Sequence, residues 1–341
     1  EADRIFEGRL LPEQRLPALL EESRKYQAEV SNHLAEQVLD ALWDLLHGFQ
    51  AADEAVDGRL LGETSREDPQ HIYGALATVL LRMVFVLYAE DRGLMPQDDV
   101  YQSNYSVAGM YERLREDAGL YPDTMDQRYG AWAGLLSLFR LVFDGGHHHG
   151  LSLPPRHGQL FNPDEYPFLE GRPQRVLRVV GERIDPPRVS DGVVFRVLQN
   201  LLVLKGERLS YRALDVEQIG SVYEAMMGFE VERAFAPSIA LKPSGGAASK
   251  LKGHVVVDLQ KVLGTAAGKR ATLLKDEANC DVSGAAATAL KDAGSIPDLV
   301  AALDNRVSPR TRTVLPPGSL YLQPGEERRR TGSHYTPREL T

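Results

Sequence analysis

The chain has 341 residues, of which 43% are hydrophobic, so it is long enough to bury one large core or two modest ones. Its formal net charge of −9 excludes a surface that is basic all over, and any contact with nucleic acid must come from a local patch. The single cysteine, Cys280, excludes an internal disulfide and is interpreted as a small buried apolar residue.

The first 145 residues have the periodicity of helices. Apolar residues at spacings of three and four predict one long amphipathic helix, with a stripe formed by Tyr26, Val30, Leu34, Val38, Leu42, Leu45 and Phe49. A second helix, from His71 to Arg92, is apolar nearly all round. Further helices are expected over 106–118 and 128–143. Because a helix that is apolar on all sides needs neighbours on all sides, we place 71–92 at the centre of a bundle.

The second helix raises the question of a membrane span. Ile72 to Ala89 carries Arg82 as its only charge, and an arginine at the centre of a span costs about 2.5–3.5 kcal/mol. Three charged residues follow directly. We therefore predict a core helix, no signal peptide and a cytoplasmic protein.

The rest of the chain is less regular. Residues 146–190 are rich in Gly and Pro and predict a long ordered crossing loop. Helices return at 191–203 and at 215–227, and residues 239–241 and 254–257 predict a hairpin with a long loop. Short helices are expected after the caps Ser283 and Ser295, and a last strand over 319–323.

Three segments carry a resemblance to a known family. Residues 329–337 (RRTGSHYTP) resemble the signature that opens the catalytic domain of large adenine-N6 DNA methyltransferases. Residues 214–224 (LDVEQIGSVYE) and 81–96 (LRMVFVLYAEDRGLMP) are similar to two further segments of the same enzymes. The family includes the type IIG restriction–modification enzymes and the adenine methylases of the DISARM and BREX phage-defence systems. The resemblance covers the chain from about residue 72 to its end.

The resemblance implies part of a site for S-adenosylmethionine. In these methylases the Tyr-Thr-Pro stretch lines the cofactor pocket, so the cofactor-binding residues here are His334, Tyr335, Thr336 and Pro337. Many relatives have Tyr or Phe where this chain has His334. The alternative is a plain helix start, with proline in the first turn.

Positive charge gathers towards the C-terminus. From 305 to 341, seven arginines face three glutamates. Arg328, Arg329 and Arg330 are therefore candidate contacts to DNA phosphates, which position a duplex without reading its sequence. A solvated charge run, paired with Glu326 and Glu327, is the equal alternative. The same DNA hypothesis is weaker for 306–312.

We expect no catalytic residue within the chain. It contains no Gly-x-Gly, which excludes the usual cofactor loop. The segment Asp185-Pro186-Pro187-Arg188 resembles the loop that grips a flipped adenine, but it has arginine where an aromatic ring must stack. Residues 162–166 (NPDEY) lack the second proline.

A nuclease or metal centre is not expected either. The restriction nuclease of a fused enzyme of this kind needs an acidic residue and then an acid-x-Lys on a strand to hold Mg²⁺ and a water, and none of the nine lysines has Asp, Glu or Gln two residues before it. His147, His148 and His149, with His157 nearby, lie in a Gly-flanked segment that we interpret as an exposed loop. Adventitious nickel or zinc binding is the alternative.

The expected fold class is mainly α: a helical bundle, then a smaller α+β segment with a hairpin, leading into a Rossmann-like methyltransferase domain. The expected segments are a helical bundle (1–145), a crossing loop (146–190), a helical connector (191–230), an α+β segment (231–325) and the start of the methyltransferase domain (326–341). We expect an N-terminal scaffold, inactive alone, of an S-adenosylmethionine-dependent enzyme that acts on double-stranded DNA and meets other defence-system subunits, with no membrane contact. The alternative is a non-enzymatic helical interaction module that binds a protein partner or DNA.

Incubation of the protein with Mg²⁺ and supercoiled plasmid should leave the plasmid intact, because no acid-x-lysine motif is present to hold the metal. Gel electrophoresis measures the outcome. Clean linearisation that is abolished by a chelator would contradict the exclusion of a nuclease.

Overall fold

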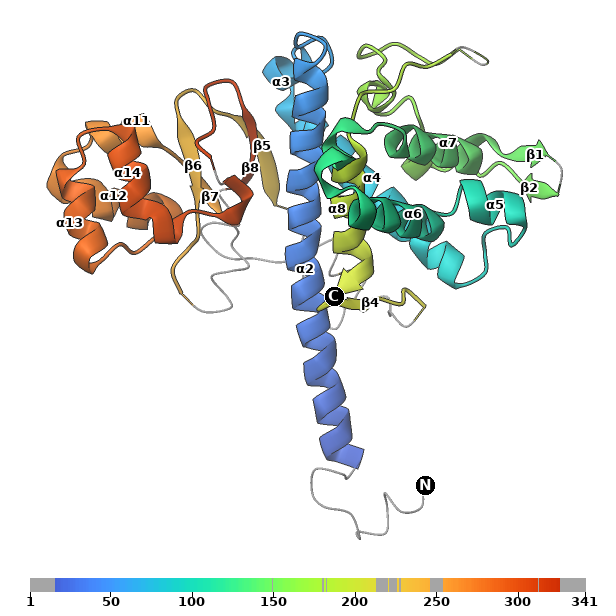
Figure 1. Ribbon diagram of the computed structural model, residues 1–341, viewed down its shortest axis with the longest axis horizontal. Coiled ribbons are helices and arrows are strands. Elements are labelled where there is room, and N and C mark those ends of the chain that lie inside the picture. The colour runs from blue at the N-terminus through green and yellow to red at the C-terminus, as the bar shows by residue number, and fades with distance from the viewer. Residues whose placement is uncertain are drawn as a thin grey trace.

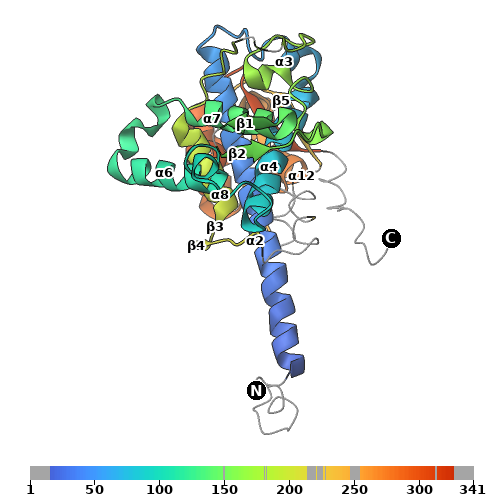
Figure 2. The same cartoon turned by 90° about the vertical axis from the view of Figure 1, so that its right-hand side faces the viewer.

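The computed structural model describes residues 16–325, apart from 149, 180, 182, 213–219, 221–225, 227, 246–253 and 312, with side chains from residue 33 onwards except that of 35. The fold is mainly α. A long helix, α2 (Leu16–Glu54), runs through the middle of the molecule, with helices on one side and a smaller α+β lobe on the other (Figure 1). Viewed from the helical side, α8 lies in front of α2 and the orange and red elements of the lobe lie behind (Figure 2).

The helical side contains α3 (Thr64–Glu67), α4 (Pro69–Asp91), α5 (Asp99–Asn104), α6 (Val107–Leu120), α7 (Ala131–Asp144) and α8 (Asp191–Leu202). Their starts follow the rules of helix capping. The side chains of Asp68, Asp98, Ser106 and Ser190 accept hydrogen bonds from the first-turn N–H groups of α4, α5, α6 and α8. The third predicted helix, 106–118, is therefore α6, and the fourth, 128–143, is α7 preceded by a 3₁₀ turn (Pro122–Gln127).

Helix α4 is enclosed by protein. It packs against α2, α6 and strand β5 (Phe229–Arg233), and most of its apolar side chains are buried. Among the described residues it is the one helix long and apolar enough to cross a membrane. Its Arg82 is buried and donates from Nε to the Leu160 carbonyl (2.6 Å) and from Nη2 to the Asn162 carbonyl (3.1 Å). Burial lowers the pKa of Arg82 to about 10, and the two carbonyls satisfy its guanidinium.

The segment predicted to be a crossing loop is more structured than its composition indicates. It contains a short hairpin, β1 (Gly146–His148) with β2 (Leu151–Leu153), and two 3₁₀ turns (Gln159–Phe161 and Pro167–Glu170). Phe161 and Phe168 from these turns enter the main core. Glu170 is buried and pairs with both Nε (2.6 Å) and Nη2 (2.7 Å) of Arg140 on α7. Local composition misses such packing because the partners are distant in sequence.

After a short hairpin, β3 (Val203–Leu204) with β4 (Glu207–Arg208), the lobe begins. Its elements are β5, β6 (Ser238–Leu241), β7 (Val255–Asp258), α11 (Leu259–Gly264), α12 (Arg270–Ala278), α13 (Gly284–Asp292), α14 (Ile296–Leu303) and β8 (Leu320–Pro324). β6 pairs antiparallel with β7, and β5 pairs antiparallel with β8, with Phe229 opposite Pro324. The local sequence pattern does not predict β5, α11 or α12.

Two glutamine side chains extend the strand pairing. Gln323 on β8 is buried, and its amide accepts from Val256 N (2.9 Å) and donates to Val256 O (3.3 Å), so it links β8 to β7. Gln50 on α2 bonds Leu320 of β8 in the same way when its amide is oriented to satisfy both groups, with distances of 3.1 and 2.6 Å. Each amide acts as a substitute peptide group.

The lobe has a hydrophobic cluster of its own, drawn from β6, β7 and α11 to α14. Arg270 at the start of α12 is buried beside it. Its guanidinium donates to the carbonyls of Thr265 (3.1 Å), Leu290 (2.9 Å), Ala293 (2.8 Å) and Leu263 (2.9 Å). One side chain thus bonds carbonyl groups at the C-terminal ends of two helices, α11 and α13.

Replacing Arg270 by Met should lower the free energy of unfolding by about 3 kcal/mol, because it leaves several buried carbonyls without a donor. Urea denaturation followed by circular dichroism measures the change. The matched control is Lys275→Met on the same helix, whose side chain is exposed, and it should change the free energy by less than about 0.5 kcal/mol. Equal effects of the two substitutions would contradict the role of Arg270.

Candidate functional site

The C-terminal end of α4, within the segment that resembles the methyltransferase helix, is a centre of hydrogen bonding. The carboxylate of Glu90 accepts from Tyr101 Oη (2.9 Å), Ser106 Oγ (3.2 Å), Val107 N (2.8 Å) and Ala108 N (3.1 Å). It therefore caps the N-terminus of α6, where free N–H groups favour a carboxylate. Burial of Glu90 still raises its pKa above the ordinary value.

The next residue of the same segment, Asp91, fixes another part of the chain. Asp91 Oδ2 accepts from Tyr211 N (2.8 Å), which lies three residues before the second family-like segment, 214–224. Tyr211 is buried, and its hydroxyl donates to Leu201 O (3.0 Å) at the end of α8. The guanidinium of Arg92 lies 4.8 Å from the ring centroid of Tyr88. The carboxylates of Glu90 and Asp91 thus position the start of α6 and the backbone at Tyr211.

The structure brings the borders of the three family-like segments together. Strand β5 begins five residues after 224 and packs on α4. β5 pairs with β8, and Gly325 N donates to Gly228 O (2.8 Å), which joins the end of β8 to the residue before β5. Residue 325 lies four positions before the third segment. Tyr211 and β5, which flank the second segment, therefore contact α4, and the end of β8 ahead of the third segment is joined to α4 through β5.

The predicted site residues themselves lie beyond these borders. Arg328, Arg329 and Arg330, with His334, Tyr335, Thr336 and Pro337, are outside the described residues. Most of 214–224 is outside them as well.

The segment Asp185-Pro186-Pro187-Arg188 lines a cavity of about 530 Å³. The opposite wall comes from the end of α2 and the turn after it and includes Val56, Arg59 and Leu60. The cavity walls contain no aromatic side chain on which a base could stack. Three arginines and one acidic residue line the cavity, so its wall carries a net positive charge.

The described histidines of the segment 147–157 lie apart in their contacts. His147 and His148 are exposed on β1, and the ring of His157 packs edge-on against Phe143 at 5.3 Å between centroids. Within the part of the chain that the structure describes, no three His, Cys, Asp or Glu side chains are placed to hold a metal ion.

A histidine–serine pair in the lobe is structural. His254 Nδ1 lies 2.5 Å from Ser308 Oγ, an arrangement that resembles a nucleophile beside a base. Ser308 is fully buried, so a substrate cannot reach it. Burial and the charges of Arg310 and Lys242 lower the pKa of His254 to about 3, which makes it a very weak base. The pair fixes the chain ahead of β7.

The arginine in the middle of 306–312 has a structural partner. Arg310 Nε donates to Asp40 Oδ1 on α2 (2.6 Å), and only 10% of the Arg310 side chain is exposed. It joins the lobe to α2 and is not free to contact a phosphate. Cys280 is buried as predicted, and burial raises the pKa of its thiol.

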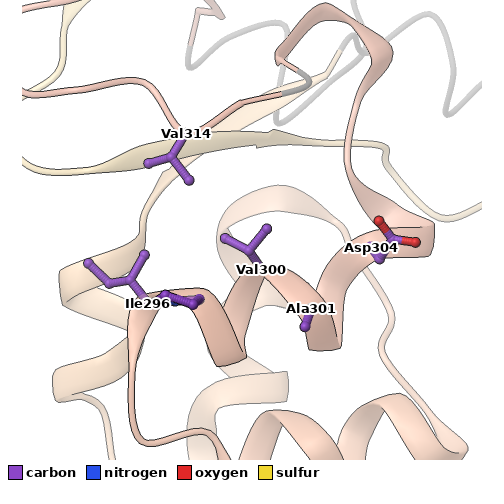
Figure 3. Close-up of a pocket in the computed structure, with 6 residues that line it drawn as sticks. Ile296, Val300, Ala301, Asp304 and Val314 are labelled. Atoms are coloured by element: carbon purple, nitrogen blue, oxygen red, sulfur yellow. The ribbon is translucent and has the colours of Figure 1, made fainter.

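One hollow of the lobe surface is apolar. Ile296, Val300 and Ala301 on α14 face Val314 across a space of about 600 Å³, with Asp304 at one end (Figure 3). Its lining offers contact area for a hydrophobic group but little hydrogen-bonding capacity.

No family model, curated protein or solved structure matches this chain. The candidate site consists of the C-terminal end of α4 with Glu90 and Asp91, together with Tyr211 and β5, which contact α4.

The raised pKa of the half-buried Glu90 should make stability depend on pH. Because its pKa is raised in the folded state, the folded protein binds this proton more tightly than the unfolded chain does. The contribution of Glu90 to the free energy of unfolding is then largest at acidic pH and falls as the pH rises through the raised pKa. Urea denaturation of wild type and Glu90→Gln across this pH range measures the free energy of unfolding of each. The value for wild type should fall relative to that of the variant as the pH rises. A pH-independent difference would show that Glu90 does not titrate.

Proposed function

We propose that this chain is the N-terminal scaffold of an S-adenosylmethionine-dependent adenine-N6 DNA methyltransferase from a cytoplasmic restriction–modification or phage-defence system. The observation that supports it best is the linkage of the three family-like segments' borders to α4. In the sequence these segments are separated by more than one hundred residues each. Three chance sequence matches in an unrelated protein would have no reason to be linked to the same helix.

The complete enzyme would take an adenine out of the duplex and transfer the methyl group of S-adenosylmethionine to N6. The scaffold would hold the chain that enters the cofactor pocket. Its anchor is β8, which is bonded by Gln50 on α2, by β5 and by Gln323 to β7. His334, Tyr335, Thr336 and Pro337 would form the first edge of the pocket, and their assignment rests on the resemblance.

The second candidate is an interaction module without catalysis. The apolar hollow on α14 favours it, because a partner's hydrophobic side chain or helix would bury Ile296, Val300 and Val314 (Figure 3). Such a module would bind its partner with no requirement for S-adenosylmethionine.

The full-length gene product should bind S-adenosylmethionine and transfer a methyl group to adenine in duplex DNA. Tyr335→Ala should weaken cofactor binding at least about tenfold, equivalent to about 1.4 kcal/mol of lost packing. Isothermal titration calorimetry measures the binding, and mass spectrometry of digested DNA measures N6-methyladenine.

The matched control is Tyr129→Ala, an exposed tyrosine ahead of α7, which should leave both readouts unchanged. A full-length product that neither binds the cofactor nor methylates DNA would overturn the methyltransferase proposal and favour the interaction module.

A further inference from the structure

The loop from 172 to 188 concentrates positive charge on an acidic protein. It contains five arginines and two acidic residues, whereas the whole chain carries a net charge of −9. Arg175, Arg183 and Arg188 are exposed and form no ion pair with any described residue. Arginines that are not neutralised by carboxylates attract a polyanion.

Two further arginines, Arg172 and Arg178, anchor the first part of the loop by bonds to carboxylates outside it. Arg172 Nη1 donates to Asp164 Oδ1 (2.8 Å) and to Val176 O (2.5 Å). Arg178 pairs through Nη2 with Asp144 Oδ1 (2.6 Å), and its backbone N donates to Asp164 Oδ1 (2.9 Å). The part of the loop from 172 to 178 is therefore held before any ligand arrives, which reduces the entropy lost on binding.

The loop leaves and rejoins the fold at the cationic cavity of about 530 Å³. Pro173 and Asp185 both line it, and Arg175 and Arg183 each lie two residues along the chain from one of these wall residues. Arg188 lines the same cavity, and Arg59 faces it from the turn after α2. Arg59 uses Nε to bond Val56 O (2.9 Å), which leaves its terminal nitrogens for an external acceptor.

Apolar side chains at the tip of the loop are more exposed than a solvated loop needs. Leu177 is 71% exposed, Val179 62% and Val176 45%. Exposed apolar side chains among unpaired arginines mark a contact surface. Proteins that grip the minor groove of DNA combine these two elements, because arginines contact the backbone and an apolar side chain enters the groove.

We propose that the basic loop surface, formed by Arg59, Arg175, Leu177, Arg183 and Arg188, binds the backbone of double-stranded DNA with Leu177 in the minor groove. The choice of DNA as the polyanion rests on the proposed function. The planar guanidinium of arginine matches two phosphate oxygens, and a duplex carries a closely spaced row of such charges. The contact would position the DNA beside α2 and carry no base specificity.

Fluorescence anisotropy of a short labelled duplex with the 341-residue protein, at about 50 to 300 mM KCl, tests the proposal. Arg183→Gln/Arg188→Gln should bind about tenfold or more weakly at low salt, and the slope of log K against log salt should fall by about 1.8, or about 0.9 for each lost phosphate contact. Leu177→Ser should weaken binding with an unchanged slope, because it removes an apolar contact and no charge.

The matched control is Arg115→Gln/Lys275→Gln, which removes the same charge from exposed positions on α6 and α12. It should retain wild-type affinity and slope. Equal losses in the two double variants, or no binding by wild type, would overturn the proposal. Binding of polyglutamate in preference to DNA at equal ionic strength would also overturn it, because an acidic protein would then be the partner.

The result can be separated from that of the methyltransferase proposal. If Arg183→Gln/Arg188→Gln abolishes DNA binding but the full-length product does not methylate DNA, the basic loop surface stands and the methyltransferase function falls. If the full-length enzyme methylates DNA with the same KM in wild type and variant, the function stands and the basic loop surface falls.

Discussion

The structure depends on the enclosure of α4. An apolar helix in the middle of a protein needs neighbours on every side, and each polar group that it carries there needs a partner. Arg82 finds two carbonyls from the segment after β2, Glu90 caps α6, and Asp91 holds the backbone at Tyr211. Three polar residues of α4 thus hold α6, the segment after β2 and the chain at Tyr211 in place around this helix.

The parts of the fold that sequence alone could predict are those with a strong local period. α2, α4 and α8 follow directly from apolar spacing and from caps such as Ser190. β5 is short, and its partner β8 lies some ninety residues later, so no local pattern identifies it. The substitute peptide bonds of Gln50 and Gln323 are also invisible in sequence, because a glutamine in a core has no periodicity of its own.

The same limit applies to the candidate site. The resemblance identified the segment that contains Glu90 and Asp91, but their action as anchors depends on α6 and Tyr211, which only the fold places beside them. Residues 172–188 belong to the segment 146–190, which is predicted to be a crossing loop because it is rich in proline and glycine. Sequence shows the arginines there, yet the division into buried anchors such as Arg172 and exposed contacts such as Arg188 depends on where Asp164 and Asp144 lie.

The lobe is attached to α2 at two separate points. Asp40 holds Arg310, and Gln50 holds Leu320. These two residues are about 15 Å apart along a helix that rises 1.5 Å per residue. A single attachment would leave the lobe free to turn about it in every direction, whereas two attachments on a stiff rod leave only rotation about the line that joins them. The packing of β5 on α4 lies off that line and opposes this remaining rotation.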